Sequence, residues 1–226
     1  MNEAFGQSES NEATEEPLAA ARRGMVERQL AARDIVDPRV LDAMRRVPRH
    51  LFVPEMWRDD SYGDHPLPLS DGQTISQPYV VALMTQLARV KPHSRVLEIG
   101  VGSGYQTAIL CELAGEVLGL EVLPSLAHSA EARLRSLGYR NFRIRVADGH
   151  GGWPEEAPFD AIVAAAAPRR IPDRLVEQLA VGGRLVLPVG EWRQRLLVIE
   201  KLVDGTYFEE DLGAVAFVPM VSAVDP

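Results

Sequence analysis

Residues 96–104 read Val96-Leu97-Glu98-Ile99-Gly100-Val101-Gly102-Ser103-Gly104, a short apolar run that leads into three closely spaced glycines. The apolar run predicts a buried strand, and the residues from 103 to 113 are expected to form a helix. Glycines between a strand and a helix let the backbone approach a ligand closely and adopt positive φ angles. The first turn of the helix adds free N–H donors. We therefore expect a nucleoside-containing ligand at this turn.

The spacing of these glycines favours S-adenosylmethionine over a dinucleotide. They follow the pattern G-x-G-x-G and not the G-x-G-x-x-G of dinucleotide-binding proteins. Glu98 lies two positions before the first glycine, where its charge would be a poor neighbour for a pyrophosphate. The same charge suits the ammonium of a methionine moiety. An NAD-dependent dehydrogenase is the alternative, and titration with reduced nicotinamide would exclude it.

Two further acidic positions support the same ligand. Glu121 ends the next predicted strand, 117–121, where a carboxylate can accept hydrogen bonds from both ribose hydroxyls. Asp148-Gly149 follows a strand predicted at 142–146 and is placed to take the adenine amino group. Each acid alone is equally explained as a strand-end or turn residue. Together they occupy the carboxyl ends of parallel strands, where open α/β sheets bind ligands.

From residue 93 onward, short apolar strands alternate with helices. This alternation indicates a mostly parallel sheet with crossover helices on both faces. Residues 184–189 are a predicted strand that follows a turn at Gly182-Gly183, and 196–203 and 207–212 predict an antiparallel hairpin. The expected fold class is α/β, a Rossmann-like S-adenosylmethionine-dependent methyltransferase sandwich with an antiparallel edge hairpin.

Composition predicts one domain behind a short tail. Residues 1–17 are expected to be a disordered acidic tail, since residues 1–16 contain five Glu and no Lys or Arg. Residues 18–226 are expected to form a single methyltransferase domain. Within it, 18–92 would be an N-terminal helical and lid region, with helices at 18–32, 38–47 and 79–90, and 93–226 the cofactor-binding core. Much of the formal net charge of −8 lies in the tail, so the body has no basic stripe for nucleic acid.

The sequence also bears on where the protein is located and on whether it binds a metal ion. No apolar run is long enough to span a membrane, and the polar N-terminus lacks the pattern of a secretory signal. The single cysteine, Cys111, fits a reducing compartment and a small buried side chain. The five histidines show no ligand-like pairing, which predicts no metal, and His65 is expected on a surface loop. A cytoplasmic monomer with neither membrane nor nucleic-acid partners is expected.

A second motif, Gly72-Gln73-Thr74-Ile75-Ser76-Gln77-Pro78-Tyr79, is absent from general methyltransferases. Through it the chain resembles the protein-L-isoaspartate O-methyltransferase family. The resemblance extends from about residue 25 to residue 221. Further collinear stretches include Val47-Pro48-Arg49, 158–162 and Phe217-Val218-Pro219.

The resemblance implies a reaction and a catalytic residue. The reaction is methyl transfer from S-adenosylmethionine to the free α-carboxylate of L-isoaspartyl residues in damaged proteins, which initiates repair through a succinimide. Ser76 matches the active-site serine of the family. Because a carboxylate is already ionised at pH 7, the enzyme needs no strong base and supplies orientation and exclusion of water. From its position alone, Ser76 also fits a helix N-cap before Gln77-Pro78.

The resemblance also assigns Thr74 and Gln77 to a lid over cofactor and substrate, and places Ser103 at the cofactor. The complete predicted cofactor-binding set is Thr74, Gln77, Glu98, Gly100, Gly102, Ser103, Gly104, Glu121, Asp148 and Gly149. The product of the cofactor would be S-adenosylhomocysteine. The chain departs from the family at Ala165, where threonine or glycine is common, and at Ala216, where arginine is common. The second departure predicts weaker contacts to the substrate.

Two other functions stay open. A relative in the same family could methylate an aspartate in one dedicated peptide, and activity on generic isoaspartyl peptides would count against this. A non-catalytic S-adenosylmethionine-binding regulator could keep the fold. The presence of Ser76 together with a full set of cofactor positions argues against a regulator.

Overall fold

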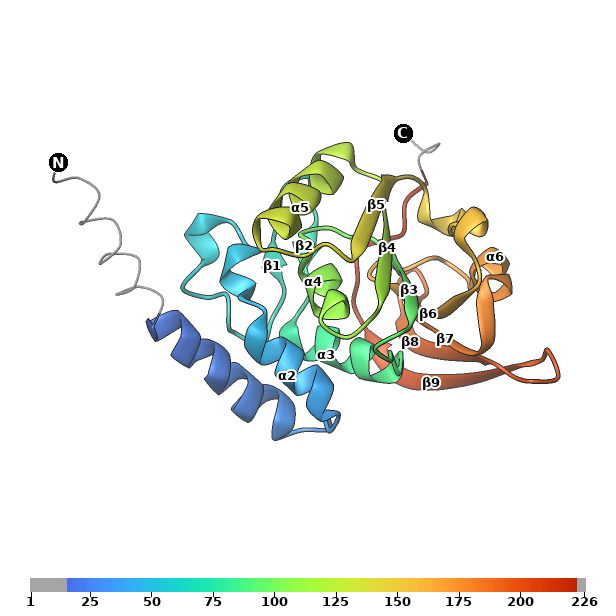
Figure 1. Ribbon diagram of the computed structural model, residues 1–226, viewed down its shortest axis with the longest axis horizontal. Helices are drawn as coiled ribbons and strands as arrows, with labels where there is room; N and C mark the ends of the chain where they lie inside the picture. Colours follow the sequence, from blue (N-terminus) through green and yellow to red (C-terminus); the bar gives the residue numbers. More distant parts are fainter. Residues whose placement is uncertain (1–15, 223–226) are drawn as a thin grey trace, which may run out of the picture.

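The computed structural model describes residues 16–222, and the first fifteen residues of the predicted acidic tail lie outside the described residues. Its centre is a seven-stranded sheet with the order β5-β4-β3-β6-β7-β8-β9 (Figure 1). The strands are β3 (Arg95–Ile99), β4 (Glu116–Glu121), β5 (Phe142–Val146), β6 (Phe159–Ala164), β7 (Leu179–Val189), β8 (Gln194–Lys201) and β9 (Tyr207–Val215). Strands β3 to β7 pair in parallel, whereas β8 is antiparallel to both β7 and β9. The predicted α/β class and antiparallel edge are confirmed.

Helices cover both faces of the sheet. On one face, α2 (Pro38–Arg46), α3 (Pro78–Leu87), α4 (Tyr105–Cys111) and α5 (Pro124–Ser136) pack against one apolar cluster. On the other face, α6 (Asp173–Glu177) packs against a second cluster. Successive strand residues point to opposite faces, so Val96 lies in the first cluster and Leu97 in the second. This two-sided burial explains why the central strands β3, β4 and β6 are mostly apolar, whereas the edge strand β5 contains Arg143 and Arg145.

The N-terminal region forms helices close to the predicted positions. A helix over residues 16–25 continues as η1 (Val26–Ala31). Helix α2 begins as predicted, because Asp37 accepts a hydrogen bond from the Arg39 N–H at 2.9 Å and Pro38 takes the first helical position. No helix among the described residues is long and apolar enough to cross a membrane.

Two local predictions need correction. The strand predicted to follow the turn at Gly182-Gly183 already begins before it, because β7 starts at Leu179; the two glycines form a bulge within β7, where its pairing with β6 jumps from Leu179 to Arg184 and Gly182 has a φ of 77°. Between the helices predicted at 38–47 and 79–90, where no strand was predicted, the structure has a small hairpin of β1 (Leu67–Pro68) and β2 (Thr74–Ile75). Its turn has positive φ at Asp71 (56°) and at Gly72 (68°). The remaining short segments are 3-10 turns, η2 (Arg49–Leu51), η3 (Glu55–Trp57), η4 (Gly149–Gly151) and η5 (Pro154–Glu156).

Candidate active site

A cleft opens at the carboxyl ends of β3 and β4, beside the point where the strand order reverses between β3 and β6. We call it the glycine-turn cleft. It encloses about 870 Å³, counted to its open mouth. Its walls come from the β1–β2 hairpin, the turn after β3, the end of β4 and the segment after β9. The sequence-predicted residues in its lining are Thr74, Ser76, Gly100, Gly102, Ser103, Glu121 and Gly149.

The glycine turn has the backbone conformation that its sequence requires. Gly100, Gly102 and Gly104 have φ angles of 84°, 54° and 86°, all in the left-handed region that disfavours side chains. Gly104 is the N-cap of α4, so the free N–H groups of the helix face this turn. Gly104 itself is outside the cleft lining and packs close to α5, where an added Cβ would come within 3.3 Å of Ala130. Its place is set by helix packing.

Glu121 links the ends of the two central strands. One carboxylate oxygen accepts the Gly102 N–H at 2.8 Å, and the other accepts the Leu123 N–H at 3.0 Å. The side chain is buried, yet it lines the cleft. Each carboxylate oxygen has a second lone pair, so both can still accept from a ligand. The two backbone hydrogen bonds therefore hold the Glu121 carboxylate in one orientation. A carboxylate that accepts hydrogen bonds from two neighbouring hydroxyls needs such a fixed orientation.

Glu98 lies deeper than predicted. It is completely buried behind the turn and does not itself line the cleft. Its Oε2 accepts a hydrogen bond from the Thr107 hydroxyl at 2.6 Å, whereas Oε1 is buried without any hydrogen-bond partner. The pKa of Glu98 is raised to about 8, mainly by burial; the Thr107 hydrogen bond opposes this rise and the charge of Glu121 adds to it. An orphaned buried oxygen of this kind is costly until a donor reaches it.

Asp148 is occupied by its own neighbours. One oxygen accepts from the His150 N–H and from its Nδ1, both at 2.8 Å, and the other accepts from the Ser222 hydroxyl at 2.5 Å. Partial burial works to raise the pKa of Asp148, but the Ser222 and His150 hydrogen bonds outweigh it and hold the pKa below its usual value. Asp148 lies outside the cleft lining, whereas the adjacent Gly149 lies within it. A Cβ at Gly149 would come within 2.2 Å of Ile99, so only glycine fits there.

A second cleft adjoins the first across the β1–β2 hairpin. We call it the lid cleft; it encloses about 1370 Å³ counted to its open mouth. Apolar side chains of α3, β8 and β9 form much of its wall. Four residues line both clefts, namely Thr74, Ser76, Ala165 and Val218. Gln77 lines the lid cleft only, and so does the family departure Ala216. A group bound in one cleft can therefore meet a group bound in the other at Ser76.

Ser76 is not the helix cap that its position suggested. The N-cap of α3 is Gln77, whose carbonyl accepts the Val81 N–H, so Ser76 lies one residue too early to cap the helix. Within residues 16–222 its hydroxyl forms no hydrogen bond, and only its carbonyl is engaged, by Arg49 at 2.9 Å. The hydroxyl is thus available to a ligand at the shared wall.

Asp64 orders the outer part of the lid cleft. It accepts hydrogen bonds from the Gln77 side chain at 2.8 Å and from the Tyr79 N–H at 3.0 Å. It also pairs with Arg33 at 3.0 Å, and the Arg33 guanidinium stacks 3.3 Å over the Tyr79 ring. Gln77 is therefore turned toward Asp64, away from the glycine-turn cleft.

The segment after β9 is a wall of the cleft that the sequence did not predict. Residues 217–222 form what we call the strap, in which Val218, Pro219, Met220 and Val221 line the glycine-turn cleft. The strap is held to the end of β6 by two backbone hydrogen bonds with Ala167, each 2.8 Å, and to Asp148 through Ser222. Only the motif Phe217-Val218-Pro219 signalled this segment, through its resemblance to the family. Tyr105 and Gln106 are further lining residues that were not predicted.

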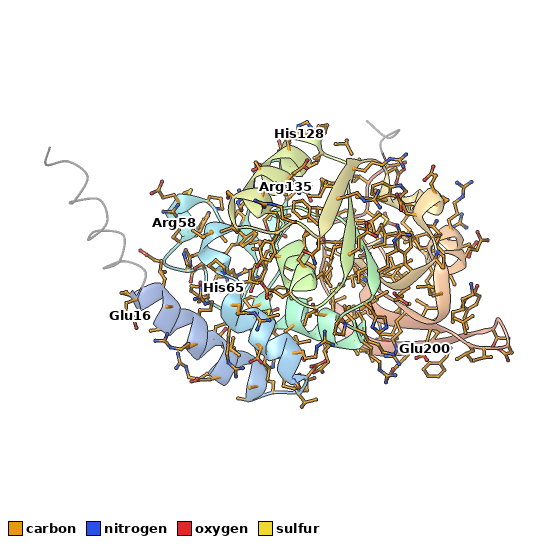
Figure 2. All side chains as sticks on the ribbon, in the orientation of Figure 1. Glu16, Arg58, His65, His128, Arg135 and Glu200 are labelled. Atoms are coloured by element: carbon orange, nitrogen blue, oxygen red, sulfur yellow. The ribbon has the colours of Figure 1, made fainter. Side chains whose placement is uncertain are left out.

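Other candidate residues lie apart from the clefts. Cys111 is buried, and burial raises the pKa of its thiol, in agreement with a packing role. His65 is exposed and pairs with Asp60 at 3.2 Å, as expected for a loop residue. Among residues 16–222 no group of three or more His, Cys, Asp or Glu side chains is arranged to hold a metal ion. Charged side chains of both signs project around the outline of the molecule in Figure 2, where Arg58, Arg135 and Glu200 lie on separate elements.

The residues of the glycine-turn cleft fit S-adenosylmethionine. Positive-φ glycines leave room for close backbone approach, Glu121 presents a fixed carboxylate, and the orphaned Glu98 Oε1 lies behind the turn. A cationic amine near that oxygen would supply the missing donor.

Comparisons with known proteins agree with this site. A model of the protein-L-isoaspartate(D-aspartate) O-methyltransferase family matches residues 20–225. A protein-L-isoaspartate O-methyltransferase of Synechococcus sp. is 54% identical over 214 residues, which are 91% of this chain and 87% of that protein. One from Syntrophobacter fumaroxidans is 54% identical over 202 residues, 89% of this chain and 94% of the relative.

A solved structure extends the likeness to the cofactor. A Plasmodium falciparum protein assigned to the protein-L-isoaspartate O-methyltransferases was solved in complex with S-adenosyl-L-homocysteine. It superposes with a TM-score of 0.77 at 30% identity, over 88% of this chain and 98% of its own. The sequence motifs, the two clefts that meet at Ser76 and these relatives lead to one conclusion: the chain belongs to the protein-L-isoaspartate(D-aspartate) O-methyltransferase family.

Proposed function

We propose that this protein transfers the methyl group of S-adenosylmethionine to the free α-carboxylate of L-isoaspartyl residues in damaged proteins, which initiates their repair through a succinimide. The observation that carries the proposal is the position of Ser76 in the wall shared by the two clefts. A methyl donor in the glycine-turn cleft and a carboxylate in the lid cleft would meet at this residue.

The cofactor supplies an activated methyl group, and transfer breaks its bond to the sulfonium sulfur as a bond to a carboxylate oxygen forms. The carboxylate is already ionised at neutral pH, so no residue has to remove a proton. The Ser76 hydroxyl donates to the carboxylate and orients it for in-line attack. The hairpin and the strap exclude water from the meeting point, where hydration of the carboxylate would slow the reaction.

The residues of the cofactor-binding set predicted from sequence differ in the roles that we propose for them. Gly100, Gly102 and Ser103 form the cradle, and Glu121 accepts hydrogen bonds from the ribose. Glu98 acts from behind the turn on the methionine end, and Thr74 closes the hairpin over the site. Gly104, Gly149 and Asp148 shape the backbone around the ligand, with Gln77 on the substrate side.

The lid cleft suits an extended peptide. Its apolar walls and open mouth impose few side-chain requirements, and a peptide with an isoaspartyl kink could enter from the β9 side. Ala216 leaves this wall without the arginine that is common in the family, so we expect recognition of the carboxylate to depend on Ser76 and the lid backbone. The protein acts as a monomer in the cytoplasm, without membrane or nucleic-acid partners.

The test is transfer of labelled methyl to two peptides that differ only in L-isoaspartate versus L-aspartate. Strong labelling of the isoaspartyl peptide alone supports the proposal. Labelling of neither peptide, with cofactor binding intact, would refute it and favour a dedicated substrate.

A further inference from the structure

One buried charged side chain, that of Arg49, has no part in the reaction described above. Arg49, in η2, has no exposed surface and is the largest of the fully buried side chains. It belongs to the stretch Val47-Pro48-Arg49, which marked the family resemblance without indicating a role. A buried cation is costly, so its contacts bear on what it does.

The guanidinium of Arg49 joins three loop segments through their backbone carbonyls. It donates to Ser61 O at 2.7 Å, to Ser76 O at 2.9 Å and to His65 O at 3.4 Å. Its central carbon lies 5.2 Å from the ring centroid of Tyr105, the first residue of α4. One side chain therefore connects the lid, the loop before it and the helix that follows the glycine turn.

No carboxylate neutralises this cation directly. Within residues 16–222 Arg49 forms no ion pair with an Asp or Glu side chain, and the charge of Asp64 acts on it without direct contact. Burial lowers the pKa of Arg49 to about 10, so it stays protonated at neutral pH. An apolar side chain would fill the space without the desolvation cost, but it could not donate to three carbonyls.

We infer that Arg49 is a positioning residue for methyl transfer: it fixes the backbone of Ser76 at the wall between the clefts and ties it to Tyr105 beside the glycine turn. The inference rests on the proposed role of Ser76. The planar fork of arginine holds donors in fixed directions, whereas the single ammonium of lysine cannot reach all three carbonyls. Tyr105 lines the glycine-turn cleft. Arg49 therefore contacts both Ser76, in the wall between the clefts, and a residue of the cofactor cleft.

The test compares Arg49→Lys and Arg49→Met with the unchanged protein, below the melting temperature of each. We expect dissociation constants for S-adenosylmethionine within about threefold of the original, because Arg49 does not line the glycine-turn cleft and none of its hydrogen bonds reaches the glycine turn. We expect kcat on the isoaspartyl peptide to fall roughly 10- to 100-fold, since a misplacement of about 1 Å can cost that much. Hydrogen exchange of residues 74–77 should become faster in both variants.

Arg39→Met is the matched control. Arg39 also donates to two backbone carbonyls, Val90 O and Leu113 O, both at 2.8 Å, but neither residue lines a cleft. This variant should melt earlier while its kcat and its exchange at 74–77 stay unchanged. It separates general loss of stability from loss of position.

Two results would overturn the inference. The first is an unchanged kcat in Arg49→Lys, which would show that the charge suffices without the fork geometry. The second is unchanged exchange at 74–77 in the Arg49 variants. Should Arg49→Met fail to fold, Arg49→Lys carries the test alone. If the unchanged protein does not methylate the isoaspartyl peptide, the proposed function fails, and the exchange measurement still decides whether Arg49 holds the lid.

Discussion

Glu98 and Glu121 stand on adjacent strands of the sheet, yet their surroundings differ. Glu121 is bound by two backbone N–H groups and borders the cleft. Glu98 has a single hydroxyl partner and an orphaned oxygen behind the glycine turn. The first is fixed as an acceptor, and the second is a buried carboxyl group with a raised pKa.

This difference predicts a proton released on cofactor binding. With its pKa at about 8, Glu98 is mostly protonated at pH 7, and a nearby ammonium would favour the ionised form. Binding should therefore release up to one proton at pH 7, and affinity should rise with pH and level off above about 8. Calorimetry in two buffers of different ionisation enthalpy measures the release, and Glu98→Gln is the control that should abolish it. Equal heats in both buffers for the unchanged protein would contradict the assignment.

Substitutions of Ser76 and of Glu121 should affect different steps, the first methyl transfer and the second cofactor binding. Ser76→Ala is expected to reduce methyl transfer and leave cofactor affinity nearly intact, because its hydroxyl faces the shared wall. Glu121→Ala should weaken cofactor binding by about 1–3 kcal/mol through loss of a charged hydrogen-bonding partner. Single-turnover rates and equilibrium titration provide the two readouts. Full turnover by Ser76→Ala would leave that residue without a catalytic role.

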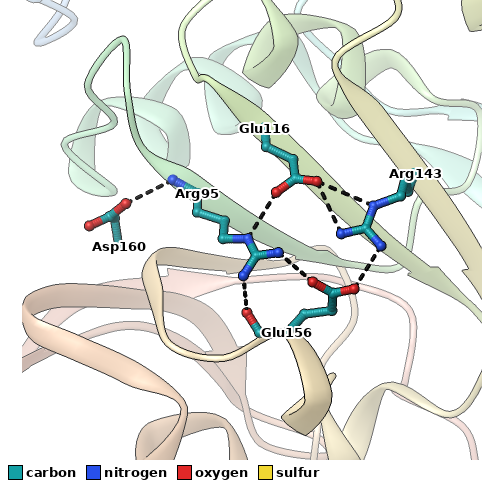
Figure 3. Close-up of polar contacts among 5 residues, drawn as sticks. All are labelled: Arg95, Glu116, Arg143, Glu156 and Asp160. Atoms are coloured by element: carbon teal, nitrogen blue, oxygen red, sulfur yellow. Dashed lines mark hydrogen bonds and ion pairs between the residues drawn. The ribbon is translucent and has the colours of Figure 1, made fainter.

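At the scale of elements, the amino-terminal edge of the sheet is joined by an ion-pair network (Figure 3). Arg95 and Arg143 both pair with Glu116 and with Glu156, and the Arg95 N–H donates to Asp160 at 2.7 Å. The network connects the starts of β3 and β4, Arg143 of β5 and η5. It lies at the opposite strand ends from the glycine turn.

We expect Glu156→Gln to lower the melting temperature at low salt by no more than a few degrees. The difference should shrink at high salt, because the exposed pairs are screened, and cofactor affinity should not change. Glu131→Gln, which removes the isolated Glu131–Arg135 pair on α5, is the control and should have a smaller effect. Thermal melts at two salt concentrations make the comparison. A loss that is equal at both salt concentrations would argue against an electrostatic contribution.

Elements built from local signals were predictable, and elements built from distant contacts were not. β5 has the predicted bounds 142–146, although it is an edge strand in which only Phe142 is buried, because the alternation of Phe142, Ile144 and Val146 with arginines shows in its own residues. The lid hairpin was missed because each of its strands has two residues and its turn is held by Asp71-Gly72. β7 begins at Leu179, before Gly182-Gly183, and the turn preference of the two glycines survives as a bulge that interrupts the pairing of β7 with β6.

The same rule holds for the site. The glycine turn and Glu121 could be found because their chemistry follows from residues adjacent to predicted strand ends. The strap was not predicted to line the cofactor cleft because Ala167, which holds it, lies about fifty residues earlier in the chain. The hydrogen bond from Arg49 to the Ser76 carbonyl could not be predicted either, because every residue has a backbone carbonyl and the sequence does not show which one is bound.

For the whole molecule, cofactor binding should raise stability by mass action. At a concentration of about 100 times its dissociation constant, S-adenosylmethionine should add about 2.7 kcal/mol to the free energy of unfolding. For a domain of this size the melting temperature should rise by roughly 5–11 °C. Differential scanning fluorimetry measures the shift, with NADH at equal concentration as a control that should have no effect. A larger shift with NADH would revive the dehydrogenase hypothesis.

The strap follows every strand of the sheet in chain order. A ribosome therefore completes the strands, the glycine turn and the lid before it makes the residues that cover the cofactor cleft. A nascent chain that has already folded its sheet would still have an open cleft, from which the cofactor escapes easily. Tight binding would begin only when the strap reaches Ala167, so a truncated translation product that folds would compete little for the cellular supply of methyl donor.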